Sequence, residues 1–504
     1  MRYKFFVNKV IITFLSISSI FVLNFQAPAE NNLQLSKSTP EKSQENQAIS
    51  AAKETTNLTI KKNEVLTLER CLDIAFKNNP NIDLAKSTTK IYQSKIGQAK
   101  SNYFPQLNVS SGYGRQNAIT SSPIDKNSNQ YSGNISVNQL IYDFGKTPTK
   151  TNIQKLNLNA ATSDVEDKTV QIAYNVKQAY YSALLSKINR DIFEQSINQY
   201  EKHLKQANAF FEIGIRSKID VTTAEVNLSN AKLNYIKATD SYKTAIAALN
   251  NAMGIFDAPE YDVADTVTFN RPQNITNKDI KIAYKAKNNI ESAAKGTVLK
   301  SAVEKHSIIS DLSFKRYDIT LEEAIKKSFE NRPDLKSLIT KETIANESIK
   351  LAQKDYYPAL TGYANYGIGG QKFPLDNGWS FGANVDIPVF NGLLTKNQVA
   401  EARTNLDIAK LNIEILKQNI YLQVKQAYIS LTEAEKRIPI TELTVKQAKE
   451  NFDLANGRYK VGVGSSIEVN DAEISYNNAQ LSYVEAFYDY NTAYINLENA
   501  MGVK

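Results

Sequence analysis

The sequence predicts a mainly α-helical protein with a membrane β part, built from a duplicated helix–hairpin–long helix–helix unit. Short motifs recur at a nearly constant shift along the chain. Apolar or small residues recur at alternating spacings of three and four over long stretches, which is typical of coiled-coil helices. Four shorter segments alternate apolar with polar residues, as β-strands do. Only 13 prolines and 19 glycines in 504 residues favour long uninterrupted elements.

The composition excludes several classes of protein. A hydrophobic content of 42% with 22% charged residues is too apolar for a disordered chain and too polar for a bundle of membrane helices. One cysteine excludes a Cys-based zinc or iron–sulfur site, and two distant histidines argue against a His-ligated metal site or a His-based catalytic triad. We therefore expect neither cofactor nor enzyme activity. Three of the 60 basic residues and none of the 52 acidic ones lie in residues 1–29, and the remaining charges are interspersed. Nucleic acid is therefore not an expected partner.

The N-terminus has the features of an export signal. Residues 1–9 are basic, residues 10–25 are apolar, and Ala27-Pro28-Ala29 resembles a signal-peptidase site, so we expect a cleaved signal peptide over 1–29. An uncleaved anchor is the alternative, but the apolar run is shorter than the ~20 residues that span a bilayer. Residues 30–65 are polar without any period, which predicts a flexible leader.

The chain consists of two copies of one unit. Leu66–Glu69 recurs as Ile319–Glu322, a shift of 253, and Val176–Tyr180 recurs letter for letter as Val424–Tyr428, a shift of 248. A five-residue difference therefore lies between these motifs. The predicted repeats span 66–254 and 319–504, and a polar connector at 255–318 with one helical stretch near 279–304 joins them.

Each repeat is predicted to hold three helical blocks. In chain order they are a first helix (68–102 and 321–355), a long middle helix (146–212 and 393–459) and a return helix (217–252 and 466–501). The middle helix would be about 100 Å long. The two shorter helices laid end to end match it, so one long helix can pair with two stacked short ones. Pro439 should bend the second long helix.

Each repeat also contains a predicted strand pair, at about 106–114 with 132–142 and at about 359–368 with 379–389. Their alternation is typical of a membrane β-barrel, although a soluble hairpin packed on a core shares it. Export, and the absence of other apolar surface to cover the hairpins, favour the membrane. Four strands cannot close a barrel, and open sheet edges are not tolerated in hydrocarbon. Several copies must therefore contribute, and three would give twelve strands.

The chain after residue 65 resembles the TolC family of outer-membrane efflux proteins. The motifs that carry the resemblance are Tyr103–Leu107, Leu140–Gly145, Ile387–Gly392 and Tyr459–Gly462 with Ala472-Glu473. The resemblance implies a homotrimer with a 12-stranded barrel in the outer membrane, continuous with a long periplasmic α-helical barrel. It also implies an equatorial belt that includes 255–318. The implied function is an exit duct for a tripartite efflux pump or a type I secretion system. Its partners would be a periplasmic adaptor (membrane fusion) protein, an inner-membrane pump or ABC transporter, and outer-membrane lipid.

The candidate site residues cluster at the two turns between long and return helices, near Gly214 and Gly462. Each glycine suits the left-handed position that ends a helix. Ser217 with Asp220, and Ser465 with Glu468, have the spacing of capping boxes at the start of the return helices. In the family these turns form the periplasmic tip, where we expect contact with the adaptor.

The resemblance also implies a closed entrance at this tip. Its ring of acids corresponds to Glu468 and Asp471, and its latch tyrosine corresponds to Tyr459 with Asp220 as partner. The arginine of the latch corresponds to Gly464, so that link is missing, whereas Arg216 occupies the equivalent place in the first repeat. Either Arg216 supplies the charge from the other side, or the latch is weaker.

A different class of function also fits the helices. An exported coiled-coil structural protein or adhesin without a pore would need only the apolar helical stripes. It would not explain the duplicated hairpins with amphipathic strands. Within the duct class, efflux and type I secretion fit the sequence equally well.

Overall fold

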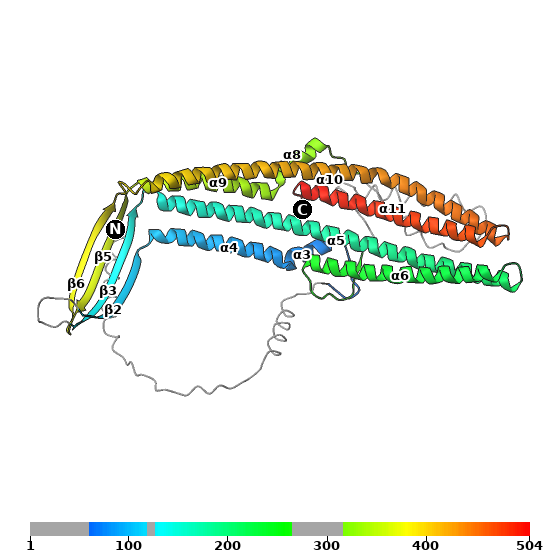
Figure 1. Ribbon diagram of the computed structural model, residues 1–504, viewed down its shortest axis with the longest axis horizontal. Helices are drawn as coiled ribbons and strands as arrows, with labels where there is room; N and C mark the ends of the chain where they lie inside the picture. Colours follow the sequence, from blue (N-terminus) through cyan, green and yellow to red (C-terminus); the bar gives the residue numbers. More distant parts are fainter. Residues whose placement is uncertain (1–59, 118–126, 265–315, 504) are drawn as a thin grey trace, which may run out of the picture. The chain divides into compact units, whose positions relative to one another are not determined.

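The computed structural model describes residues 60–117, 127–264 and 316–503, and Figure 1 shows long helices joined to one antiparallel sheet. The predicted signal peptide, the leader as far as residue 59 and the helical stretch near 279–304 lie outside these residues. At the end of the predicted leader, Ile60 is buried and Val65 lies in a short strand. The element order confirms the predicted mainly helical fold with a β part.

The helices follow the predicted duplication. They are α3 (Leu68–Asn78), α4 (Pro80–Lys100), α5 (Lys146–Glu212) and α6 (Lys218–Met253) in the first repeat, and α8 (Leu321–Asn331), α9 (Pro333–Gln353), α10 (Leu394–Lys460) and α11 (Ser466–Ala500) in the second. Both long helices contain 67 residues, as predicted. Helix α10 continues through Pro439.

The first helix of each repeat is not continuous, which corrects the prediction of single helices at 68–102 and 321–355. The breaks lie at Asn79-Pro80 and Arg332-Pro333. Proline clashes with a helical residue before it, and both preceding residues take extended conformations, with ψ of 116° and 120°. The proline then starts the next helix, where its missing N–H is not needed.

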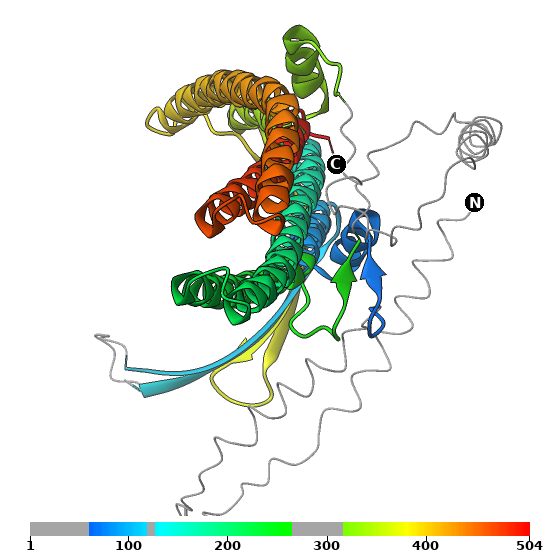
Figure 2. The same ribbon diagram turned by 90° about the vertical axis from the view of Figure 1, so that its right-hand side faces the viewer.

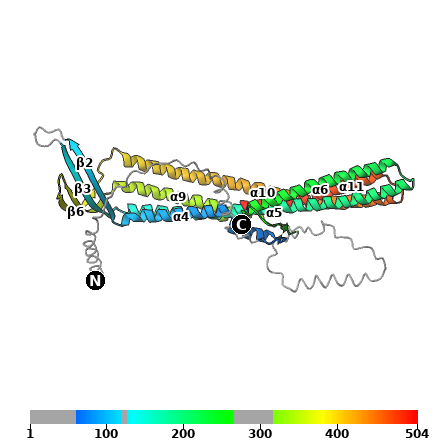
Figure 3. The same cartoon turned by 90° about the horizontal axis from the view of Figure 1, so that it is seen from below.

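The long helix α5 is the centre of the helical part. It packs against α4 and α6 from its own repeat, and against α9 and α11 from the second repeat, as can be followed in Figure 2. Figure 3 shows α4 and α6 following one another along α5. Helix α10 packs against α9 and then α11. One long helix thus pairs with two stacked short ones in both repeats, as the lengths predicted.

The stacked helices meet at two equivalent junctions. A Cβ atom added at Gly254 would lie 2.7 Å from the Cα of Asn79, and one added at Gly502 would lie 2.9 Å from the Cα of Arg332. The Asn79 side-chain amide donates to the carbonyl oxygen of Ala252 at 3.0 Å. The end of each return helix therefore abuts the break in the first helix, and only glycine leaves room for the contact.

The sheet joins the two repeats. Its strands are β2 (Gln106–Asn117), β3 (Asn127–Tyr142), β5 (Ala359–Gly370) and β6 (Asp376–Asp386), all antiparallel in the order β2-β3-β5-β6. Strand β3 pairs with β5 from Tyr131 opposite Gly370 to Tyr142 opposite Leu360, with a bulge near the end. The outer strands β2 and β6 each have one edge without a partner strand in the described chain.

The register gives the sheet one apolar and one polar face. Directly paired residues share a face of a sheet. Val109 pairs with Ile135, Ile135 with Tyr366, and Tyr366 with Trp379, so these four aligned side chains share one face. Leu107, Tyr113 and Phe381 belong to the same face, and its larger side chains are exposed. Asn108, Ser136, Asn365 and Ser380 belong to the other face.

The strand ends differ from the prediction. The first hairpin extends to Asn117 and Asn127, where the residues are polar and carry no alternation. Strand β6 begins at Asp376 and ends at Asp386, three residues before the predicted end. Asp386 already pairs with Ala359, the first residue of β5, and Pro388 follows without an N–H to donate.

None of the helices in the described ranges is both long and apolar enough to cross a bilayer. The single cysteine, Cys71, is buried in the core between the helices.

Candidate gate at the helical tip

The two helix-to-helix turns lie at the end of the helical part away from the sheet (Figure 1). Gly214 and Gly462 take left-handed conformations, with φ of 72° and 83°. In each turn a later amide bonds back to the end of the long helix, from Ile215 to Phe210 at 2.9 Å and from Val463 to Arg458 at 3.1 Å. These bonds satisfy carbonyl groups that the helix end would otherwise leave unpaired.

The predicted capping boxes are only partly present. The Ser465 hydroxyl accepts from the Glu468 amide at 3.1 Å, as an N-cap should. The Ser217 side chain makes no capping bond, so the prediction is wrong for the first repeat. The Glu468 carboxylate lies 3.6 Å from the Arg458 guanidinium.

Arg216 reaches from the first repeat to the turn of the second. Its Nη2 donates to the carbonyl oxygen of Gly464 and, at 3.4 Å, to that of Gly462. Its guanidinium also lies over the Tyr459 ring, 5.3 Å from the centroid, in a cation–π arrangement. Arg216 therefore brings a positive charge of the first repeat to the turn of the second repeat.

The surroundings of Gly464 leave no room for a side chain at this position of the second repeat. A Cβ atom added there would lie 2.9 Å from the Tyr459 amide nitrogen and 3.0 Å from the Arg458 Cβ. Such contacts essentially never occur, so a longer side chain would force the turn apart.

Tyr459 is fully buried, with no exposed surface. Its ring contacts the rings of His203 and Phe210, with centroids 5.1 Å and 5.6 Å away. Its hydroxyl has no hydrogen-bond partner among the residues that the structure describes, so the expected bond to Asp220 is absent. Burial raises the Tyr459 pKa and the negative charge of Asp220 raises it further, while Arg216 lowers it. Asp220 is thus near the tyrosine but does not bond it.

The two candidate pore acids lie in the first turns of α11. Glu468 and Asp471 are both exposed and are three residues apart, so they project from one side of the helix. Asp471 takes no part in the N-cap of the helix. Since Glu468 has Arg458 beside it, Asp471 is the less compensated of the two charges.

A second buried stripe on α11, which the sequence reasoning missed, faces α5. It comprises Ser466, Glu473, Gln480 and Phe487 at seven-residue intervals, and all four are buried. Across it on α5 lie Ser196, Tyr200 and His203. The Asn477 amide donates to the Ser196 hydroxyl at 3.0 Å, and His203 Nε2 lies 3.3 Å from the Ser466 hydroxyl. The seven-residue spacing is present in the sequence, but three of the four residues are polar, so a search for apolar periodicity does not find it.

Two of these buried groups have displaced pKa values. Burial raises the pKa of the Glu473 carboxyl to about 8. Burial lowers the pKa of His203, and the charge of Asp220 opposes this in part. Both side chains are therefore predominantly uncharged at neutral pH.

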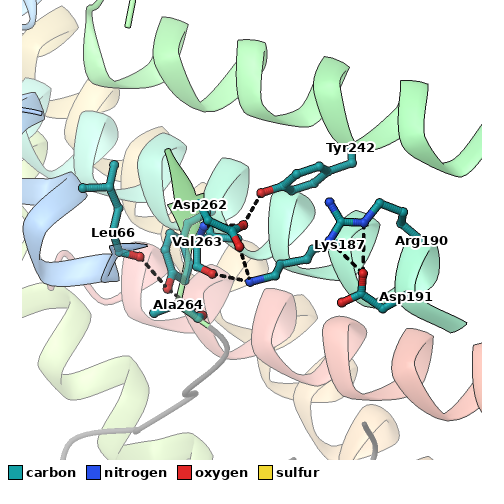
Figure 4. A network of polar contacts seen from close by, with 9 residues as sticks. Leu66, Lys187, Arg190, Asp191, Tyr242, Asp262, Val263 and Ala264 are labelled. Atoms are coloured by element: carbon teal, nitrogen blue, oxygen red, sulfur yellow. Dashed lines mark hydrogen bonds and ion pairs between the residues drawn. The ribbon is translucent and has the colours of Figure 1, made fainter. Parts of the chain in front are cut away.

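A separate polar network ties the short sheet of β1 (Val65–Leu66) and β4 (Asp262–Val263) to α5 and α6 (Figure 4). The buried Lys187 ammonium lies 2.9 Å from the Asp262 carboxylate and donates to the Val263 carbonyl oxygen at 2.8 Å. The Tyr242 hydroxyl donates to the same carboxylate at 2.5 Å. Hydrogen bonds and the positive charge of Lys187 outweigh burial and lower the Asp262 pKa. The network fixes the start of the connector at the middle of α5.

Within the described ranges, no three His, Cys, Asp or Glu side chains are grouped so that they could hold a metal ion. The polar groups of the tip are arranged to hold helices together.

The comparisons with known proteins agree with this architecture. The sequence profile of the family described as "Outer membrane efflux protein" matches residues 71–255 and 324–503. The toluene efflux pump outer membrane protein TtgC of Pseudomonas putida is 19% identical over 447 residues, which cover 86% of this chain and 82% of TtgC. The outer membrane protein TolC of Escherichia coli is 22% identical over 441 residues, covering 84% and 80%. The crystal structure of the CmeC outer membrane channel of Campylobacter jejuni superposes with a TM-score of 0.66 at 17% identity and covers 94% of both chains.

The profile covers most of the chain and follows its duplication, since its two matches fall in the two repeats. Channel proteins of this family catalyse no reaction, which agrees with the expectation from composition. The match also favours a channel over the alternative of an exported structural coiled coil. The chain therefore belongs to the outer membrane efflux protein family, and it is a TolC-like channel protein of the outer membrane that serves efflux or secretion.

Proposed function

We propose that three copies of this chain form one channel, with a 12-stranded β-barrel in the outer membrane and a helical duct that closes at the tip. The observation that carries this proposal is the pair of unpaired edges on a sheet with one apolar face. In hydrocarbon such edges must be paired. Strands β2 and β6 run antiparallel to each other, so β6 of one copy can pair with β2 of the next and continue the alternation.

The helical part supports the same assembly. Helix α10 carries a second stripe of exposed apolar residues at seven-residue spacing, comprising Ile408, Ile415, Leu422 and Ile429. Helices α4 and α6 lie on the other side of α5 from α9, α10 and α11. Helix α6 exposes Ile219, Val226 and Leu233, and α4 exposes Leu84 and Ile91, also seven residues apart. Stripes of this spacing pair helices in coiled coils. The α10 stripe lies in the half of the helix towards the sheet, as α4 does, so it would cover the α4 stripe of the neighbouring copy.

The tip would act as the gate of this duct. Arg216 and Tyr459 would hold the two turns of each copy together. Three copies of Glu468 and Asp471 would place six carboxylates around a narrow entrance, which attract cations and repel anions. The turns at Gly214, Ser217, Gly462 and Ser465 would be the surface offered to a periplasmic adaptor protein, which would link the duct to an inner-membrane pump or an ABC transporter.

The test is planar-bilayer conductance of the detergent-purified mature chain, with its mass determined in the same preparation. We expect a trimer with a small, cation-selective conductance that divalent cations reduce. A monomer or dimer without channel activity would contradict the proposed assembly.

The acidic ring has its own test in the Asp471→Asn and Glu468→Gln variants. We expect Asp471→Asn to reduce cation selectivity more, because Arg458 already offsets part of the Glu468 charge. Lys232→Gln, an exposed charge change on α6, is the control. Unchanged selectivity in both acid variants would show that these residues do not line the entrance.

A further inference from the structure

The contact between the two helical hairpins changes character along its length. In the half towards the tip, the hairpin α5–α6 meets the hairpin α10–α11 mainly through α5 and α11. In its middle part this contact is apolar, with Ile188, Ile192 and Val484 in one buried cluster. At the end farthest from the tip, Tyr174 and Lys177 bond to Asn496 and Glu498. Towards the tip it becomes the polar seam formed by Ser196, Tyr200 and His203 of α5 and Ser466, Glu473 and Asn477 of α11.

Glu473 is the exceptional member of the polar seam. It is 1% exposed, and its Oε1 atom has no hydrogen-bond partner in the described part of the chain. Its burial alone accounts for the displaced pKa, with no positive charge contributing. An ionised carboxylate in such a place would lose its hydration without compensation. The packed seam therefore requires a protonated Glu473.

The titratable groups around Glu473 do not replace a counter-ion. On α5, Tyr200 is close enough for the Glu473 charge to raise the tyrosine pKa, and His203 is held neutral by burial. On α10, Asp453 raises the pKa of Tyr476, and Tyr459 is buried beside His203. On α6, Asp220 acts on His203. Asp453 and Asp220 are acids, so they add no stabilisation for a charged Glu473.

We propose that the polar seam is a pH-sensitive fastening of the closed tip, which holds while Glu473 is protonated and loosens when Glu473 ionises. This rests on the proposed function of the tip as a gate. Glu473 acts in addition to the contacts of Arg216. It lies in the contact between the α5–α6 and α10–α11 hairpins, which would separate when the tip opens.

The sign follows from the two states. In the separated state Glu473 is hydrated and ionises near its ordinary pKa of 4.5, whereas in the packed state its pKa is about 8. Between these values the separated state loses its proton and the packed state keeps it. Closing therefore weakens as pH rises, by up to about tenfold in the equilibrium constant per pH unit and per chain. Protonation of His203 has the opposite effect on closing. Burial lowers the His203 pKa, so at acidic pH the separated state binds this proton more readily and closing is weakened there.

The test compares the open probability of the assembled channel between pH 5.5 and 8.5 in wild type, Glu473→Gln and Glu485→Gln. Glu485 is an exposed acid on the same helix and serves as the matched control. We expect a rise with pH in wild type and in Glu485→Gln that is lost in Glu473→Gln, which stays closed. The pore acids are unchanged in all three proteins, so only the difference between variants counts.

A retained pH response in Glu473→Gln would overturn the inference while leaving the channel itself in place. Absence of channels in every variant would instead contradict the proposed function. Hydrogen exchange of the wild-type protein gives a second test that needs no variant. After correction for intrinsic rates, protection over 466–480 should fall between pH 6 and 8 relative to 484–497, and an equal change in both segments would also overturn the inference.

Discussion

At the scale of single residues, the tip is distinguished by an arginine of the first repeat that contacts the turn of the second repeat. The turn at Gly462–Gly464 is too tightly packed against Tyr459 and Arg458 to hold a side chain at Gly464. Arg216 reaches the same turn from the other repeat and uses its planar, multivalent donor group on two carbonyl oxygens and an aromatic ring. A lysine in its place could not make all these contacts at once.

The first prediction concerns Arg216. Arg216→Ala should remove a cation–π contact and hydrogen bonds to backbone carbonyls, together worth about 2 kcal/mol per chain for closing the tip. Arg216→Lys should lose most of this as well. We expect a raised open probability in planar bilayers for both variants. Lys218→Ala, two residues away and exposed, is the control, and a wild-type open probability in Arg216→Ala would show that the arginine does not hold the tip closed.

At the scale of elements, the breaks in the first helices decide how the long helices are paired. Asn79-Pro80 and Arg332-Pro333 are visible in the sequence as a repeated pair, but we predicted a single helix across each of them. The restriction that proline places on the residue before it breaks the helix there. The break gives the incoming end of the return helix a place to abut, which lets two short helices share one long partner.

The second prediction concerns this junction. Gly254→Ala should destabilise the protein in two ways, because the residue has φ of 77° and the new Cβ would lie 2.7 Å from the Cα of Asn79. Gly214→Ala has the same backbone penalty, with φ of 72°, but meets no atom within 4 Å. We expect Gly254→Ala to cost roughly 1–3 kcal/mol more than Gly214→Ala, as overpacking does. Thermal unfolding followed by circular dichroism measures the difference, and equal losses would mean that the junction can relax.

At the scale of the whole molecule, the described chain leaves two kinds of surface that a single copy cannot satisfy. These are the edges of β2 and β6 and the exposed apolar stripes of α4, α6 and α10. Both lie on the outer elements, α10 and β6 on one side and α4, α6 and β2 on the other. Apolar area of this extent on a protein surface marks an interface.

The third prediction tests the stripes apart from the sheet. Ile415→Glu with Leu422→Glu would place two charges per chain in the proposed contact between copies, where burial without a partner is strongly unfavourable. We expect the trimer to dissociate or fail to form, as judged from mass in detergent. Lys417→Glu, an exposed change two residues from Ile415, should leave the mass unchanged. An intact trimer in the double variant would place the contact elsewhere.

The sequence by itself determined the repeat, the long helices to within a residue, and the alternation of the strands, because these depend on periods of 3.5 and 2 that are local. It also placed Gly214, Gly462, Arg216 and Tyr459 at the turns. Only the tertiary structure decided which side chains a helix buries against its second neighbouring helix. Glu473 is buried because α11 packs on both α10 and α5, and Tyr459 lacks the expected bond to Asp220 because aromatic rings enclose it. Which side chains a helix buries depends on how many neighbours it has, and a single-helix pattern does not contain that number.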